Sequence, residues 1–237
     1  MVRAILEGRK TQTRRIMKPQ LSQNLYATRI RYEQHPFSPS AFAGTPAEGR
    51  VEGEDRMSWV AYDWVDNPVG VEEKDWLKCP YGVPGDRLWV RETWHPAARL
   101  GTEYEIEYQA DKSSLLKDAG WEGATPTIDR AIDSGWKPSI HMPRWASRLT
   151  LEIVSVRVER LQDITEEDAK AEGVEPVGLS SFNMMQYRDY SGESGDKGFH
   201  SPRSSYESLW EKINGAGSWD KNPWVWVVEF KKLEAQS

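Results

Sequence analysis

The chain has 237 residues, enough to bury a substantial core as one large domain or two small ones. Its single cysteine, Cys79, excludes an internal disulfide and a multi-cysteine zinc site. A net charge of −6 argues against broad duplex binding, which depends on phosphate neutralisation. The longest apolar run, residues 224–228, is far below the ~20 residues of a membrane span, and no signal peptide follows Met1. We therefore expect a cytoplasmic protein without a membrane span, and its oligomeric state stays open.

The first third of the chain predicts a short helix and a long insertion. Val2, Ile5 and Leu6 have the i, i+3, i+4 spacing of an amphipathic helix, which Gly8 can end. Residues 20–84 are rich in Pro, Gly, Ser and charge, with no sustained period. That composition predicts a long irregular insertion.

The middle of the chain predicts strands that build a curled sheet. A turn at 85–86 should begin a strand over 87–94, and strict alternation over 103–108 predicts a strand with one solvated face. Residues 112–137 form a second insertion. Over 147–161 the apolar phase shifts near Ile153, which predicts a β-bulge of the kind that lets a sheet close into a barrel.

The last third predicts two helices and a closing strand. Thr165 begins a capping box for a short helix that Gly173 can end. After a third insertion over 176–204, an apolar stripe over 206–213 predicts a helix capped by Ser204 or Ser205 and stopped at 214–215. A mostly buried strand follows over 224–230. The fold class is therefore α+β.

Twelve tryptophans are the strongest anomaly of composition. Indole rings can stack on nucleobases. Large core residues whose N–H groups find partners are the more common use, and we expect it for most of them.

The densest chemical signal is the segment over 8–15, with four cations and two hydroxyls. If it is extended, Thr11, Thr13 and Arg15 share one face. Partial burial would lower the pKa of Lys10 and make it a proton acceptor. From spacing alone, a solvated basic turn is the first interpretation.

The segment over 5–14, Ile-Leu-Glu-Gly-Arg-Lys-Thr-Gln-Thr-Arg, resembles the signature that opens ASCH domains. Further matches follow in the family's order and cover about half of the chain. The resemblance implies a PUA-like, mixed but mainly antiparallel β-barrel with short flanking helices, formed by a single domain over 1–237 with the three insertions. The matches lie over 85–90, 149–173 and 224–232, and the segments over 138–148 and 210–230 resemble a longer branch common in phages and prophages.

The small bacterial members of the family are amidohydrolases that remove acetyl from N(4)-acetylcytidine. Their catalytic Lys, Thr and Glu fall on Lys10, Thr13 and Glu172, and the resemblance implies no cofactor. The chain departs from them in being about twice their size. It also lacks the strand that usually precedes the first helix, which leaves open whether Met1 is an internal methionine.

Cations interleaved with an indole predict a second contact region for nucleic acid. Arg14, Arg144, Trp145 and Arg148 are expected to contribute to one electropositive surface that binds substrate or single-stranded RNA. The alternative is a loop whose arginines pair with the surplus acids. No metal site is expected, because the four histidines are far apart and none has a recognised ligand spacing.

Two function classes stay open. One is an amidohydrolase acting on N(4)-acetylcytidine or a related acylated cytidine. The other is a non-catalytic module that binds a modified nucleoside or single-stranded RNA, and a structural phage protein is a weaker third. An enzyme needs Lys10, Thr13 and Glu172 in one pocket, whereas a binding module needs only a basic, aromatic-lined groove.

Overall fold

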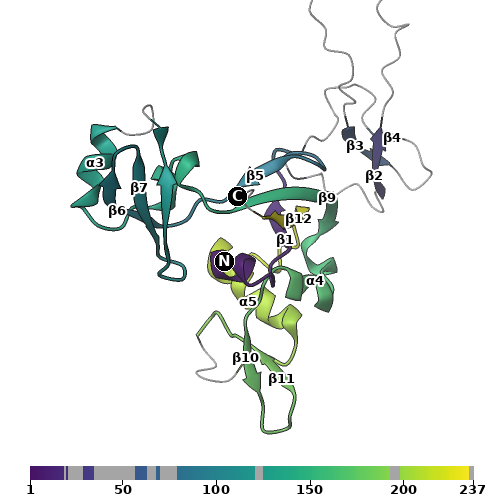
Figure 1. Cartoon of the computed structure of the whole chain (residues 1–237). Coiled ribbons are helices and arrows are strands. Elements are labelled where there is room, and N and C mark those ends of the chain that lie inside the picture. The colour runs from purple at the N-terminus through teal and green to yellow at the C-terminus, as the bar shows by residue number, and fades with distance from the viewer. Residues whose placement is uncertain are drawn as a thin grey trace, which may run out of the picture.

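The computed structural model describes residues 1–18, 20, 29–34, 57–62, 68–69, 79–120, 125–192 and 198–234. Within them the protein is α+β, with mostly antiparallel strands and few short helices (Figure 1). Trp64, Trp76 and His35 lie outside these ranges. No helix in the described part is long and apolar enough to span a membrane.

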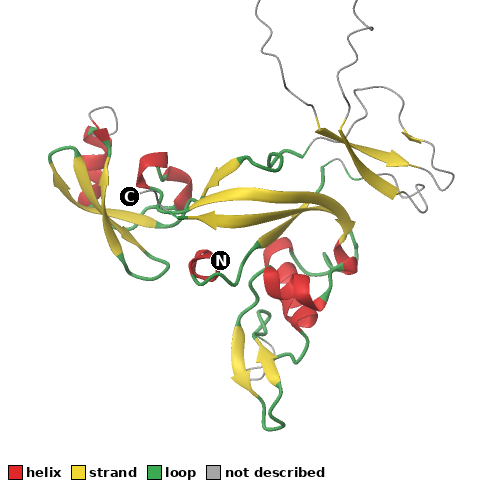
Figure 2. Cartoon of the chain, turned by 45° about the vertical axis from the view of Figure 1, so that its right-hand side comes forward, coloured by secondary structure: helices red, strands yellow, loops and turns green. Residues whose placement is uncertain are grey.

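A curled sheet of four antiparallel strands forms the centre of the molecule (Figure 2). Its order is β1-β12-β9-β5, and the long strands β9 and β12 pair along their whole length. The pairing shifts where Glu229 lies opposite Ser155 and Phe230 lies opposite Ile153, so Val154 is an extra residue. The predicted bulge near Ile153 is confirmed, and the strong bend it allows gives a half-barrel. The strands are β1 (Gln12–Ile16), β12 (Trp224–Leu233), β9 (Thr150–Arg160) and β5 (Arg87–Trp89).

Short helices pack beside this sheet. The helices α1 (Val2–Leu6) and α4 (Glu166–Ala171) begin and end as predicted: Thr165 accepts a hydrogen bond from the Asp168 amide at 3.1 Å, and Gly173 has φ +87°. The third, α5 (Pro202–Asn214), starts earlier than predicted, because the Ser201 hydroxyl accepts from the Ser204 amide and Pro202 is the first helical residue. A 3₁₀ turn, Leu161–Asp163, joins β9 to α4.

A separate lobe is built from a second antiparallel sheet, β6 (Trp94–Leu100), β7 (Glu103–Tyr108) and β8 (Ser114–Asp118). It has its own apolar cluster around Trp94, Tyr104, Ile106, Tyr108, Met142 and Ala146. Figure 1 shows this lobe, with α3 (Pro126–Ile132), to the left of the central sheet. Two 3₁₀ turns, Ser139–His141 and Arg144–Ala146, complete it.

The lobe corrects one prediction and confirms another. The continuous strand expected over 87–94 is wrong, because residues 87–89 pair with β9 in the central sheet and Trp94 already pairs with Tyr108 in the lobe. The alternation over 103–108 is confirmed, since Tyr104, Ile106 and Tyr108 are fully buried.

The predicted irregular insertions contain regular strands, so that part of the prediction is wrong. Residues 112–137 include β8 and α3. Residues 20–84 include β2 (Arg29–Gln34), β3 (Met57–Tyr62) and β4 (Pro68–Val69), which form one sheet. Residues 176–204 include the hairpin of β10 (Pro176–Leu179) and β11 (Met185–Tyr187). These strands are stabilised by hydrogen bonds to other segments of the chain. Their own sequences have no clear hydrophobic periodicity, so no local pattern predicts them.

The tryptophans in the described part are mainly core residues, as predicted. Trp210 and Trp219 pack with Tyr206 under α5, whereas Trp224 and Trp226 pack with Met17 and Ile153 on the other side of the sheet.

Candidate functional site

The family-like segment at the N-terminus meets the end of α4 in space. Lys10 and Glu172 form an antiparallel bridge, and the Thr11 amide donates to the Ala171 carbonyl at 2.8 Å. A Cβ at position 173 would lie 2.8 Å from the Lys10 Cβ and 3.1 Å from the Ala4 Cβ. Only glycine therefore allows the two segments to approach this closely.

The Lys10 ammonium is buried and fully hydrogen-bonded. Its Nζ donates to the carbonyl oxygens of Gln12 and Glu172, both at 2.8 Å, and to Glu172 Oε2 at 3.0 Å. Burial lowers the pKa of Lys10, and the charge and hydrogen bond of Glu172 oppose that shift. Three acceptors match the three N–H bonds of an ammonium, so this arrangement favours the charged form of Lys10 and opposes the effect of burial.

Arg14 holds the other oxygen of Glu172 and gathers two more carboxylates. Its guanidinium, with no exposed side-chain surface, lies 3.3 Å from Glu172 Oε1, 2.9 Å from Asp168 Oδ2 and 3.0 Å from Glu159 Oε2. Arg157 extends the network to Glu229. The Arg14 Nε is buried without a hydrogen-bond partner in the described part of the chain.

Strand alternation explains which residues of the segment enter this network. Lys10, Gln12 and Arg14 are buried, whereas Thr11 and Arg15 are exposed. Gln12 donates from Nε2 to the Asp168 carbonyl at 2.8 Å, which fixes β1 against α4. The prediction of a solvated basic turn is wrong for these three residues, because α4 brings acceptors opposite them.

Lys10, Thr13 and Glu172 line one small cavity of about 60 Å³. Thr13 is half-buried, and its hydroxyl has no hydrogen bond to any residue that the structure describes. The three residue types predicted for catalysis thus lie together, although 162 positions separate the lysine from the glutamate.

Tyr206 also lines this cavity and was not singled out from the sequence. Burial, and then the charge of Glu172, raises the pKa of its phenol well above the usual value, so Tyr206 stays a neutral hydroxyl. Its helical spacing indicated only a core position. Nothing in the local sequence signals that its ring faces a carboxylate.

The four residues predicted to bind RNA do not share one basic surface. Arg14 is enclosed, and Arg148, 7% exposed, pairs with Glu92 and Asp111, both at 2.8 Å. Trp145 packs against the lobe core, and Arg144 is exposed. The expected electropositive surface is corrected accordingly, because the acids of the chain neutralise Arg14 and Arg148 in the interior. The binding roles of Arg144 and Trp145 stay predictions.

No family model, no curated protein and no solved structure matches the chain. Among the residues described, no three His, Cys, Asp or Glu side chains form a group that could hold a metal ion.

Proposed function

We propose that this protein is an amidohydrolase acting on N(4)-acetylcytidine or a related acylated cytidine, with Lys10, Thr13 and Glu172 as its catalytic residues. The proposal includes a PUA-like arrangement of the half-barrel. The observation that carries it is the shared cavity: a hydroxyl, a buried amine and a buried carboxylate all line it. Buried ionisable groups beside a free hydroxyl are typical of nucleophilic catalysis.

The cavity suits the reacting group rather than the whole substrate. A volume of about 60 Å³ accepts a small acyl group or water, but not a nucleoside. The acetyl group would therefore enter it, and the cytidine would stay outside. Amide hydrolysis needs only the acyl carbon to reach the nucleophile.

Proton transfer within the buried pair supplies both the base and the acid. When Lys10 passes a proton to Glu172, the neutral amine can take the proton of the Thr13 hydroxyl as its oxygen bonds to the acetyl carbon. The C–N bond then breaks, and the Glu172 carboxylic acid protonates the departing cytosine nitrogen. Water attacks the acyl-threonine, Glu172 accepts a proton from this water, and Lys10 returns its own proton to the Thr13 oxygen.

Arg14 has a positioning role in this scheme, because its guanidinium holds Glu172 Oε1 at 3.3 Å. Its buried Nε–H, which lacks a partner among the described groups, is also available to an oxyanion.

One observation favours the non-catalytic alternative. All three N–H bonds of Lys10 already have acceptors, as expected of an ion pair that only holds β1 to α4. In that case the protein would bind a modified nucleoside or single-stranded RNA without changing it.

Release of cytidine from N(4)-acetylcytidine separates the two functions. We expect activity in the parent protein and a loss of about 100-fold or more in Thr13→Val, which removes the nucleophile and keeps the side-chain shape. Glu172→Gln and Lys10→Met should be equally impaired. Thermal melts of each variant check folding.

Thr11→Val is the matched control, because Thr11 is exposed and does not line the cavity. It should keep full activity. Full activity of well-folded Thr13→Val would remove Thr13 from the mechanism, and an inactive parent on all acylated cytidines would favour the binding module.

A further inference from the structure

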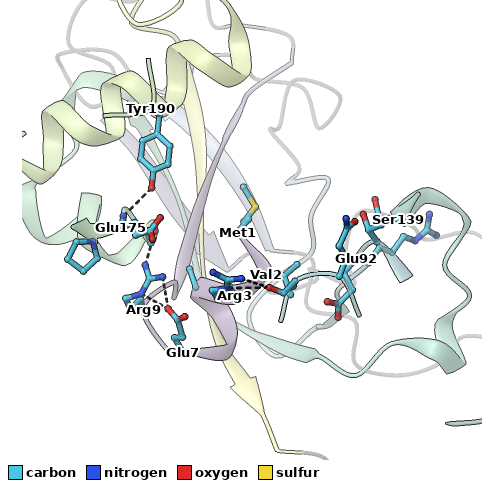
Figure 3. Close-up of a pocket in the computed structure, with 16 residues that line it drawn as sticks. Met1, Val2, Arg3, Glu7, Arg9, Glu92, Ser139, Glu175 and Tyr190 are labelled. Atoms are coloured by element: carbon cyan, nitrogen blue, oxygen red, sulfur yellow. Dashed lines mark hydrogen bonds and ion pairs between the residues drawn. The ribbon is translucent and has the colours of Figure 1, made fainter. Parts of the chain in front are cut away.

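A second, much larger cavity lies between the central body and the lobe. Its volume is about 770 Å³, within the range of pockets that hold nucleotide-sized ligands. One wall comes from the segments over 1–9 and 173–176 and from Tyr190, and the other from residues 91–93, 109–110 and 139. In Figure 3, Met1, Val2 and Arg3, which belong to the first wall, are drawn between Glu175 and Glu92.

The two cavities are direct neighbours. Arg9 and Gly173 line the large cavity, whereas their chain neighbours Lys10 and Glu172 line the small one. Met1 lines both cavities, so the two lie on either side of the same N-terminal segment.

The acids of the large cavity are neutralised by arginines. Glu7 pairs with Arg9 at 2.6 Å, as Figure 3 shows. Glu175 pairs with Arg188 at 2.9 Å. Glu92 pairs with Arg148 at 2.8 Å.

Arg3 and Arg91 have no carboxylate partner among the described residues. Arg3 donates only to the Ala110 carbonyl, from Nε at 3.2 Å and Nη2 at 2.9 Å. Arg91 donates to the Ile140 carbonyl at 3.3 Å, and its guanidinium lies 4.6 Å from the centre of the Trp89 ring. Both guanidinium groups are thus oriented, and each keeps N–H bonds that no described residue accepts, so the described lining of the cavity has a local positive surplus in a chain of net charge −6.

Neutral donors complete this surface. The Tyr190 hydroxyl oxygen accepts a hydrogen bond from the Glu175 amide at 3.1 Å. The hydrogen of this hydroxyl has no acceptor among the described residues and is available to a ligand. The side chains of Gln109 and Ser139 line the cavity without a hydrogen bond to any residue in the described ranges. Oriented arginines with neutral donors around them are suited to the several oxygens of a phosphate.

We propose that this inter-lobe cavity binds the phosphate of a phosphorylated ligand through Arg3 and Arg91. The rest of the ligand would be a cytidine whose acylated base reaches Lys10, Thr13 and Glu172. This part of the inference rests on the proposed function. The substrate is then a nucleotide or an RNA rather than a free nucleoside.

Binding of cytidine, cytidine 5′-monophosphate and the cytidine tetramer CpCpCpC, measured by titration calorimetry, tests this inference. We expect the parent to bind one or both phosphate-bearing probes about tenfold or more tightly than cytidine, with an advantage that weakens as salt rises. The monophosphate and the tetramer distinguish a terminal phosphate from a phosphodiester. The advantage should disappear in Arg3→Gln/Arg91→Gln and, in part, in the exposed single variant Arg91→Gln.

Arg87→Gln/Arg130→Gln is the matched control, because it removes the same charge from exposed residues outside the cavity. Equal affinity for all three probes, or an advantage that survives Arg3→Gln/Arg91→Gln, would overturn the phosphate site. Hydrolysis of N(4)-acetylcytidine without a phosphate advantage would refute only this site. A phosphate advantage without hydrolysis would refute only the amidohydrolase.

Discussion

Arg14 illustrates how strongly one side chain can depend on its surroundings. From the sequence it is one of four cations in a short segment, and in the structure it is completely enclosed by Glu159, Asp168 and Glu172. Removing a buried charge from such a cluster leaves its partners uncompensated. Arg14 therefore carries more of the stability of the site than an exposed cation would.

We expect Arg14→Met to lower the free energy of unfolding by about 3–5 kcal/mol. Arg157→Met is the matched control, since Arg157 contacts two of the same carboxylates but is 29% exposed. Its loss should cost about 1 kcal/mol or less. Urea unfolding, monitored by tryptophan fluorescence, measures the free energy of unfolding of both variants. Equal losses would show that the burial of Arg14 adds nothing to stability.

The ion pair of Asp111 is expected to make the stability of the protein depend on pH in the acid range. The hydrogen bond from Arg148 lowers the pKa of Asp111 to about 2, below the usual 3.8. Because the folded-state pKa is depressed, the contribution to stability is present above pH ~4 and is lost as the pH falls towards 2. Melting temperatures between pH 6 and 2 should fall less steeply for Asp111→Asn than for the parent. Asp133→Asn, at an exposed position that forms no ion pair with any described residue, should follow the parent.

The connection at the end of α4 is the one that positions the candidate site. Gly173 has a left-handed backbone, which any L-residue resists, and it also lies against Lys10 and Ala4. Strain and a steric clash therefore act at the same position. The same glycine places Glu172 opposite Lys10.

Gly173→Ala is expected to destabilise the protein by about 2–4 kcal/mol and to reduce the amidohydrolase activity that we propose. Gly135→Ala serves as the comparison, because Gly135 also has positive φ, +70°, but nothing lies within 4 Å of its Cβ position. Strain alone should cost that variant about 1 kcal/mol. If the two variants unfold at the same urea concentration, close packing against Lys10 contributes nothing.

In the part of the chain that the structure describes, the apolar residues of the central sheet and those of the lobe form separate clusters. Ile106 is fully buried in the lobe, and Val227 is fully buried in β12. The large cavity lies between the two parts, so relative movement of the lobe would open or close it.

We predict that Ile106→Ala lowers hydrogen-exchange protection in β6, β7 and β8 by about 2–4 kcal/mol while β9 and β12 keep their protection. Val227→Ala should instead lower the protection of β9 and β12 while β6, β7 and β8 keep theirs. Loss of protection throughout the chain in Ile106→Ala would show that the two parts unfold as one unit.

Much of the local structure follows from the order of residues. The capping residue Thr165, the glycines at 8 and 173, and the phase shift near Ile153 act through backbone geometry and through neighbours a few positions away. The same holds for the alternation over 103–108. Such features need no knowledge of the rest of the chain, and the structure confirms them.

Only the tertiary structure determines which charges are buried and which cavity they face. Lys10 and Arg14 become enclosed because α4 and β9 bring carboxylates from more than 140 positions away, and Arg148 is neutralised by Glu92 in the same manner. The free energy of an ion depends on its solvation and on the groups opposite it. Neither is encoded in the spacing of neighbouring residues, so the sequence alone favours a solvated basic turn around Lys10, and only the fold decides that this lysine is buried and which groups it contacts.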